Sequence, residues 1–297
     1  MNSSTEILCI GSVLWDVIGR SASTMRVGSD VPGRITRLPG GVALNIAMTL
    51  RRFDLTPSLL SVVGQDAVGD ELVKECDAMG LETSHIYRSR DLPTDRYMAV
   101  EGQNGLIAAI ADAHSLEQAG RKILASLMNG TLGDANTPYS GVIALDGNLT
   151  ENLLREIAGL DEFSKADLRV APASPGKADR LIPLIGHAGT TLYVNREEAE
   201  LICRSEFDDA TSAAIGLLEK GASRVLVTDG GRSACDGHVD GVLSAKPQEV
   251  LVTRITGAGD TFMAAHIAAE IRGLPREEAL EAALNAAATY VSGDIGA

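Results

Sequence analysis

Short apolar segments alternate with longer segments of helical periodicity along most of the chain. Runs rich in Val, Ile and Leu predict buried strands at 7–10, 59–63, 141–145, 168–171, 191–194 and 224–228. Between them, apolar residues at helical spacing predict helices at 42–53, 66–79, 116–127, 152–160, 196–203 and 209–220. Strands separated by helices indicate right-handed βαβ units, so we predict an α/β fold with a mainly parallel sheet and helices on both faces.

Two stretches near the N-terminus break this rhythm. Residues 33–38 alternate between polar and apolar, and the apolar segments 97–100 and 106–110 flank a turn-rich stretch. Hairpin strands with one solvated face predict a small sheet outside the main one. We interpret it as a β lid over a site, formed by about 12–38 and 90–112; an edge extension of the main sheet or a dimer contact is the alternative.

The C-terminal part of the chain is predicted to be helical. Gly273 and Pro275 separate two helical patterns, at 260–272 and 276–291, as a C-cap and a helix start would. No internal repeat or composition shift divides the chain, so we predict a single domain over 1–297.

Composition excludes several classes of function. Lys and Arg number 26 against 40 Asp and Glu, a net charge of −14, so we expect no nucleic-acid partner and no anionic membrane surface. No apolar run is long enough to span a membrane, and the first residues do not resemble a signal peptide. The four cysteines lack metal-ligand spacing and are expected to be free thiols, so we expect a cytoplasmic protein.

Two glycine-containing segments carry the candidate chemistry. Gly257, Ala258 and Gly259 directly precede a helical pattern, where free backbone N–H groups and the helix dipole predict an anion hole beside Asp260. A glycine-rich loop with a capping Asp is the structural alternative. In the second segment, Gly40 and Gly41 open a helix that carries Asn45 among apolar residues. Neither a P-loop motif nor a dinucleotide-binding fingerprint is present in the sequence.

Together these segments resemble the two signatures of the ribokinase-like (PfkB-type) family of carbohydrate and nucleoside kinases. The matching motifs are Gly40-Gly41-x-x-x-Asn45-x-Ala47 and Thr256-Gly257-Ala258-Gly259-Asp260, together with Asp16, Asn195-x-x-Glu198 and Thr228-Asp229-Gly230-Gly231. The resemblance spans nearly the whole chain. It implies a ribokinase-like three-layer α/β/α domain with a small β lid, and ATP-dependent phosphorylation of an alcohol group.

The resemblance also implies roles for individual residues. Asp260 would accept the proton of the attacking hydroxyl, and the backbone of Gly257, Ala258 and Gly259 would hold the phosphoryl charge. Asn195 and Glu198 would organise Mg²⁺ through its waters. The remaining positions would bind ATP (Thr228, Gly230, Gly231 and Asn285) or the hydroxyls of a sugar ring (Asp16, Gly40, Gly41 and Asn45).

Alternatives remain for several of these residues. Glu198 also fits a first-turn helix acid, Asp16 a loop acid, and Asn285 a residue on a helix surface. Ser233 stands where the family usually has a glycine, which bears on the local geometry of the nucleotide loop. The resemblance leaves open a monovalent cation such as K⁺ as a further cofactor, and it implies pairing into a homodimer through the lid.

Within the family, the segments 106–112, 145–150, 172–177 and 195–200 resemble pseudouridine kinases. This resemblance implies a nucleoside substrate, with Asp112 and Lys177 among the substrate-binding residues and pseudouridine 5′-phosphate as product. Ala111 and Ala171 depart from the usual Asn and Asp, and such a loss of polar groups can alter specificity. The alternatives are ribokinase, another sugar or nucleoside kinase, and a non-catalytic nucleotide-binding regulator.

Overall fold

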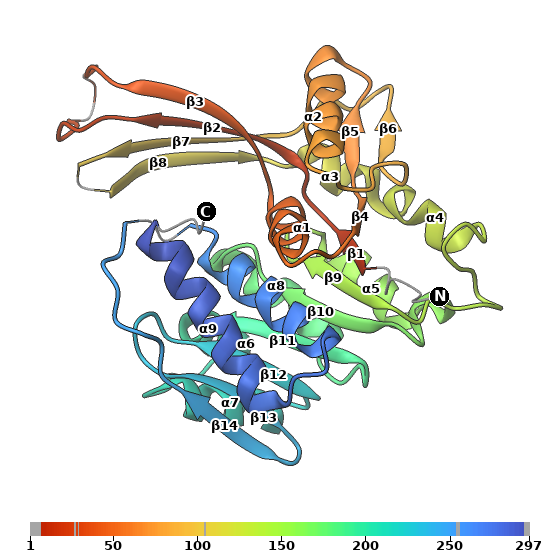
Figure 1. The fold of residues 1–297 in the computed structure, drawn as a ribbon. Coiled ribbons are helices and arrows are strands. Elements are labelled where there is room, and N and C mark those ends of the chain that lie inside the picture. Colours follow the sequence, from red (N-terminus) through yellow and green to blue (C-terminus); the bar gives the residue numbers. More distant parts are fainter. Residues whose placement is uncertain (1–6, 27, 29, 104, 254–255, 294–297) are drawn as a thin grey trace.

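An eight-stranded sheet forms the centre of the molecule (Figure 1). The computed structural model describes residues 7–26, 28, 30–103, 105–253 and 256–293. The strand order is β14-β13-β12-β11-β10-β9-β1-β4, and the neighbours from β12 to β4 are parallel. The strands are β1 (Ile7–Ile10), β4 (Pro57–Leu60), β9 (Val142–Asp146), β10 (Asp167–Ala171), β11 (Thr190–Asn195), β12 (Arg224–Thr228), β13 (Ala234–His238) and β14 (Gly241–Ala245). The predicted mainly parallel sheet is therefore confirmed.

Helices cover both faces of this sheet, as the sequence predicts. The helices are α1 (Val42–Arg52), α2 (Ala67–Ala78), α3 (His114–Ala119), α4 (Ala125–Met128), α5 (Glu151–Gly159), α6 (Arg196–Cys203), α7 (Ala210–Glu219), α8 (Ala258–Ile271) and α9 (Arg276–Ser292). None of these helices in the described part of the chain is long and apolar enough to span a bilayer.

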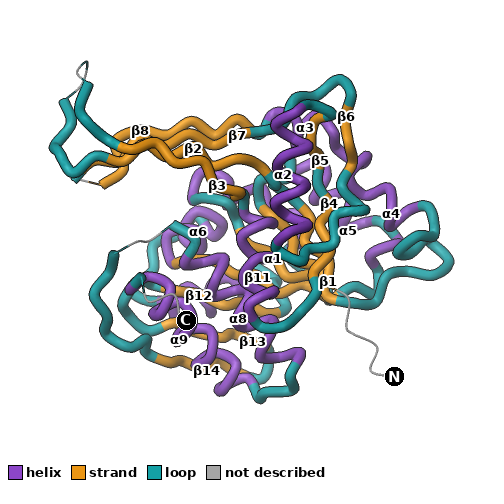
Figure 2. The backbone as a smooth tube through the Cα atoms, turned by 45° about the horizontal axis from the view of Figure 1, so that its top comes forward, coloured by secondary structure: helices purple, strands orange, loops and turns teal. Residues whose placement is uncertain are grey.

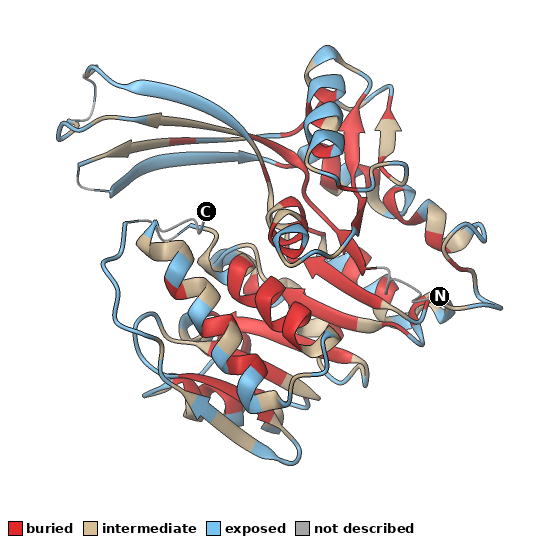
Figure 3. Cartoon of the chain, in the orientation of Figure 1, coloured by how far each residue is buried: buried red, intermediate tan, exposed pale blue. Residues whose placement is uncertain are grey.

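Alternate residues of a central strand pack into two hydrophobic cores, one on each face of the sheet. In β1, Ile7 and Cys9 pack with the cluster around α1 and α8, whereas Leu8 and Ile10 pack with the cluster around α5 and α7. Because both faces are covered, the central strands are apolar at consecutive positions (Figure 3). Helix α8 is buried over most of its length because it packs against α1, α9 and the sheet.

A separate four-stranded sheet projects from one side of the molecule (Figures 1 and 2). Its order is β3-β2-β7-β8, and all residues of β8 are exposed (Figure 3). The strands are β2 (Leu14–Arg20), β3 (Arg34–Gly40), β7 (Arg96–Gly102) and β8 (Gly105–Asp112). The sequence predicts β3, β7 and β8, whereas β2 is not among the predicted strands. The parallel pairing of β2 with β7 joins the two hairpins into one sheet.

Some predicted elements differ from the structure. The strand predicted at 59–63 is broken at Ser61, whose hydroxyl donates to the carbonyl of Gly11 at 2.5 Å. The chain then forms β5 (Val62–Gly64), which pairs with β6 (Tyr87–Ser89) in a third sheet. The helix predicted at 116–127 is divided into α3, a 3₁₀ segment (Gly120–Leu124) and α4, since Gly120 adopts φ 51°.

Candidate active site

The N-terminus of α8 is built from residues that leave its backbone open. Gly257 is the N-cap at φ 88°, and a Cβ there would lie 2.5 Å from the hydroxyl of Tyr290. Glycine therefore fits both the backbone conformation and the space. The first N–H groups of a helix lack intrahelical acceptors, so those of 258–260 are available to an anion. Asp260 is the third residue of the helix, so its interpretation as the N-cap is wrong.

Asp260 is a partly exposed residue whose carboxyl group has an unusual pKa. Burial raises its pKa to about 7, and the nearby Asp146 and Asp16 act in the same direction. Among the described residues Asn45 opposes them, by donating a hydrogen bond from Nδ2 to Oδ2 at 2.9 Å. This bond joins two signature segments that lie 215 residues apart in the sequence. A carboxylate with a pKa near neutral pH is suited to accept a proton from a hydroxyl.

The glycine pair before α1 allows two polar groups to approach closely. A Cβ on Gly40 would lie 2.1 Å from a carboxylate oxygen of Asp16, and one on Gly41 would lie 2.5 Å from the carbonyl of Ser12. Gly41 also adopts φ 101°, a conformation that favours glycine. Asp16 is largely buried, and this burial raises its pKa to about 6. The sequence-predicted residues Asp16, Gly40, Gly41 and Asn45 thus gather at one end of α1.

A second polar group beside this end of α1 was not among the predicted site residues. Asp146 ends β9 and accepts hydrogen bonds from the backbone and hydroxyl of Ser12 and from the backbone of Asn148. The Ser12 hydroxyl in turn accepts from the N–H of Val42 at 2.9 Å. The carboxyl ends of the parallel strands β1 and β9 meet at one edge of the sheet, and polar residues directly after such strands are the sequence signal for this group.

Lys177 extends this polar group. It lies in a 3₁₀ segment (Pro175–Leu184), and its ammonium donates to the side-chain carbonyl of Asn148. Burial lowers the pKa of Lys177, and the nearby Arg180 lowers it further, whereas Asp146 opposes the shift. The structure therefore places the predicted Lys177 at the edge of the site rather than free in solvent.

Asn195 and Glu198 form a capping box at the start of α6. The Asn195 side chain accepts from the N–H of Glu198 at 2.9 Å, and Glu198 Oε2 accepts from the N–H of Asn195 at 2.8 Å. Burial raises the pKa of Glu198 to about 7, with further contributions from Glu197 and Asp260. Glu198 is therefore a first-turn acid that also lies within the electrostatic field of Asp260.

The site offers no direct set of metal ligands. In the part of the chain that the structure describes, no three His, Cys, Asp or Glu side chains group as metal ligands. The second carboxylate oxygen of Glu198 accepts no hydrogen bond from any described residue. The remaining oxygen of this buried carboxylate could accept a hydrogen bond from a water molecule bound to Mg²⁺, an ion that usually keeps several of its waters in proteins.

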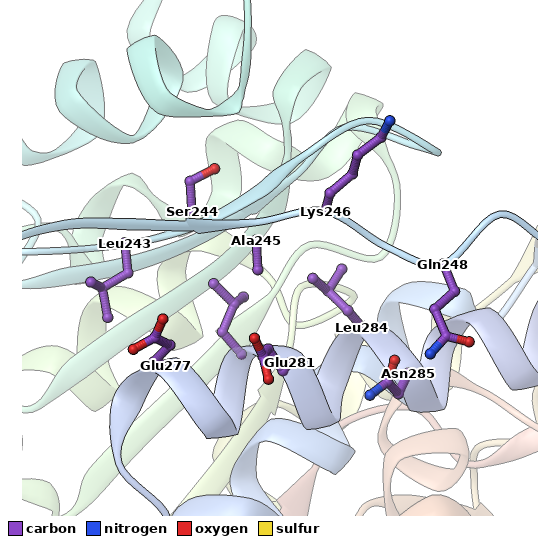
Figure 4. Close-up of a pocket in the computed structure, with 10 residues that line it drawn as sticks. Leu243, Ser244, Ala245, Lys246, Gln248, Glu277, Glu281, Leu284 and Asn285 are labelled. Carbon is purple, nitrogen blue, oxygen red and sulfur yellow. The ribbon is translucent and has the colours of Figure 1, made fainter.

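The predicted nucleotide-binding residues lie at two places, the end of β12 with the loop after it, and helix α9. Thr228 ends β12 and pairs in register with Asn195. A Cβ on Gly230 or Gly231 would meet no atom within 4 Å, so this loop is open. Asn285 on α9 lines a cavity of about 340 Å³ between that helix and β14, together with Lys246 and other residues (Figure 4).

Asp112 is placed apart from the other predicted substrate-binding residues. Strand registers pair Asp16 with Tyr97, and Tyr97 with Ala111, so these three residues share one face of the four-stranded sheet. Asp112 follows Ala111 and therefore lies on the opposite face. Its carboxylate is exposed and contacts His114 Nδ1 at 2.7 Å.

An acid with a raised pKa at an open helix N-terminus is suited to phosphoryl transfer to a small alcohol. Residues 4–294 match the family model described as pfkB family carbohydrate kinase. The chain belongs to this family and is an ATP-dependent kinase of carbohydrates or nucleosides.

Curated relatives agree with this assignment, and a solved structure shares the fold. The chain is 27% identical to the pseudouridine kinase of Escherichia coli over 285 residues, which cover 94% of this chain and 88% of that protein. It is 26% identical over 302 residues to the guanosine-inosine kinase of Exiguobacterium acetylicum, covering 97% and 94%. The structure of a ribokinase from Thermotoga maritima has a TM-score of 0.79 at 21% identity, covering 96% and 92%, and shows the same fold.

Proposed function

We propose that this kinase phosphorylates the 5′-hydroxyl of pseudouridine and that Asp260 is the catalytic base. The observation that carries the catalytic part is the Asp260 carboxyl with its raised pKa, held by Asn45 at the open N-terminus of α8. The substrate hydroxyl would lose its proton to Asp260 while its oxygen attacks the γ-phosphate of ATP. The backbone N–H groups of 258–260 would stabilise the charge on the transferred group.

The other site residues would position the reactants. Asp16 and Asn45 would hydrogen-bond the ribose hydroxyls, and Glu198 with Asn195 would hold Mg²⁺ through its waters. When bound with ATP, Mg²⁺ neutralises part of the charge on the phosphates. The cavity beside Asn285 would take the adenine, and the open loop at Gly230 would follow the phosphates.

Two observations support a nucleoside rather than a simple sugar. The similarity to pseudouridine kinase covers almost the full length of both proteins. The polar pair formed by Asn148 and Lys177 adjoins Asp146 and extends beyond the Asp16–Asn45–Asp260 group. Hydrogen-bonding groups at that position would recognise a polar base, which a free ribose lacks.

A substrate panel tests this choice. We expect kcat/KM for pseudouridine to exceed that for ribose by at least about 100-fold, since a site built to bind polar groups rejects a substrate without them. Lys177→Met is expected to lower kcat/KM for pseudouridine by about 10- to 100-fold. ADP release measured with each acceptor gives both values, and Lys165→Met on an exposed loop is the matched control.

The outcomes of this panel separate the alternatives. Turnover of ribose without turnover of pseudouridine would refute the substrate and favour ribokinase. Turnover of purine nucleosides would favour an activity like that of the guanosine-inosine kinase, to which the chain is nearly as similar. Tight ATP binding without ADP release for any acceptor would favour a non-catalytic regulator.

We further propose that the four-stranded sheet is a lid whose outer face pairs with a second copy of the chain. Its Asp16 face adjoins the site, since Asp16 raises the pKa of Asp260. The opposite face carries the exposed apolar residues Ile35, Met98 and Ile110. An exposed apolar patch of this kind is typical of an interaction surface.

Replacing Ile35 with Lys is expected to convert a dimer into a monomer, because the charge would be buried in the interface. Light scattering coupled to size-exclusion chromatography measures the mass of wild type and variant. Val239→Lys is the control, since Val239 is 84% exposed on the β13–β14 turn, outside the four-stranded sheet. A wild-type protein that is monomeric at tens of micromolar would refute the pairing.

A further inference from the structure

The far end of the four-stranded sheet carries two arginines directly opposite each other. Arg20, the last residue of β2, pairs in antiparallel register with Arg34, the first residue of β3. Like charges at opposed positions destabilise a sheet. Glu101 on β7 forms an ion pair with Arg20 at 2.5 Å, but Arg34 has no ion pair among the described residues. The arginine pair therefore keeps one uncompensated positive charge, in a chain whose net charge is −14.

A cavity of about 420 Å³ lies between these two side chains. It is lined by Arg20, Ser21, Ala22, Arg34 and Thr36, that is, by two arginines and no acidic residue. The hydroxyls of Ser21 and Thr36 donate to backbone carbonyls, so the arginines are the available donors. A guanidinium presents parallel N–H donors that match the oxygens of a phosphate group. The two arginines that line the cavity thus fit a phosphate and disfavour a cation.

The cavity is distinct from the site of phosphoryl transfer. Alternation along β2 places Arg20 on the same face as Asp16, and Arg34 and Thr36 share that face. The four residues from Asp16 to Arg20 span about 13 Å of strand, too far for one phosphate to reach both. Figures 1 and 2 show this end of the sheet projecting away from α1.

We propose that Arg20 and Arg34 form a second anion site, which binds a phosphate group on the inner face of the four-stranded sheet. A bound phosphate removes the repulsion between the two arginines and links β2 to β3 through charge-assisted hydrogen bonds. The phosphate group belongs either to a free phosphate ion or to a nucleotide. The site is independent of the identity of the phosphorylated alcohol.

Calorimetric titration of the nucleotide-free protein with inorganic phosphate tests the site. We expect Arg34→Gln to weaken phosphate binding by about tenfold, the loss expected for one charge-assisted contact. Arg52→Gln, which removes an exposed charge at the end of α1, is expected to bind phosphate like the wild type. The anion hole at α8 is common to all three proteins and cannot produce a difference. Arg34→Lys keeps the charge and is expected to recover part of the affinity.

Calorimetric titration with AMP identifies the source of the phosphate group. If the site binds a nucleotide, Arg34→Gln weakens AMP binding by about tenfold relative to Arg52→Gln. If it binds a free phosphate ion, Arg34→Gln weakens phosphate binding while AMP binding stays equal to that of Arg52→Gln. Arg34→Gln that matches Arg52→Gln in both measurements, or a wild type that binds no phosphate, would overturn the proposal.

Discussion

Replacing Asp260 with Asn is expected to lower kcat by about three to four orders of magnitude and to leave ATP binding nearly unchanged. The amide keeps the size of the side chain at the start of α8, but it cannot accept the proton of the attacking hydroxyl. The backbone N–H groups of 258–260 remain, so the nucleotide should still bind. Steady-state ADP release and calorimetric titration with ATP measure the two quantities, and near-full turnover would refute the assignment of the base.

The pH dependence provides a second measurement of the same role. Because the pKa of Asp260 lies at about 7, kcat/KM for the alcohol should fall as the pH drops below about 7. The pKa of Glu198 also lies at about 7, so the wild-type profile alone does not distinguish the two acids. Glu198→Gln should retain the acidic limb if that limb belongs to Asp260. Loss of the limb in Glu198→Gln would assign it to Glu198 instead.

The stability of the Asp260→Asn variant is the control for folding. A carboxyl group whose pKa is raised on folding contributes stability that is fully present below its unfolded pKa, near 4, and is lost as the pH rises through about 7. Asn has no proton to lose, so the variant should melt at a higher temperature than the wild type at pH 8. The two melting temperatures should converge below about pH 4. A variant that is less stable at pH 8 would make its kinetics uninformative about the base.

The parallel part of the fold is predictable because its strands are covered on both faces. β1, β9 and β12 are short apolar runs separated by helices, and few folds other than a parallel sheet covered by helices fit this pattern. The anion hole and the start of α1 are also predictable from the sequence, because the backbone conformation at Gly257 and Gly41 requires glycine. The glycine and the helix that it precedes are adjacent in the chain, so a short segment of sequence is enough to predict both.

Contacts between distant segments are not encoded in the same local way. The Asn45–Asp260 hydrogen bond depends on the packing of α1 against α8, and only the family resemblance relates the two residues in advance. The roles of Ser12 and Asn148 depend on β1 and β9 being neighbours in the sheet. Strand order is set by the whole chain, so the sequence marks both as polar residues after predicted strands but does not show that they meet.

The strand β13 shows the same effect for a charged residue. Its sequence contains Asp236, which interrupts the apolar pattern that predicts a buried strand. In the structure Asp236 is fully buried because Arg224 on β12 and Arg276 at the start of α9 both donate to it. The two arginines, 12 and 40 residues away in the sequence, neutralise the buried charge of Asp236 and so allow the strand to form. The apolar periodicity of β13 gives no sign of these partners.

Asp236→Asn is therefore expected to lower the free energy of unfolding by about 3–5 kcal/mol. The neutral amide would leave two arginines close together without their buried counter-ion, and Arg224 would keep Glu270 as its one ionic partner within the described part of the chain. Urea unfolding with an unchanged m-value measures the loss. Asp240→Asn is the matched control, because Asp240 is exposed on the neighbouring turn and pairs only with His238 among the described residues.

The effect of Asp236→Asn should depend on pH in a defined direction. Burial alone would raise the pKa of Asp236, but Arg224 and Arg276 outweigh it and hold the pKa below its usual value. A lowered pKa contributes stability that is present above the unfolded pKa, near 4, and is lost as the pH falls through the folded pKa. The difference between wild type and variant should therefore be constant from about pH 6 to 8 and shrink below about pH 4. A difference that persists unchanged at low pH would show that packing of the side chain, rather than its charge, stabilises β13 against α9.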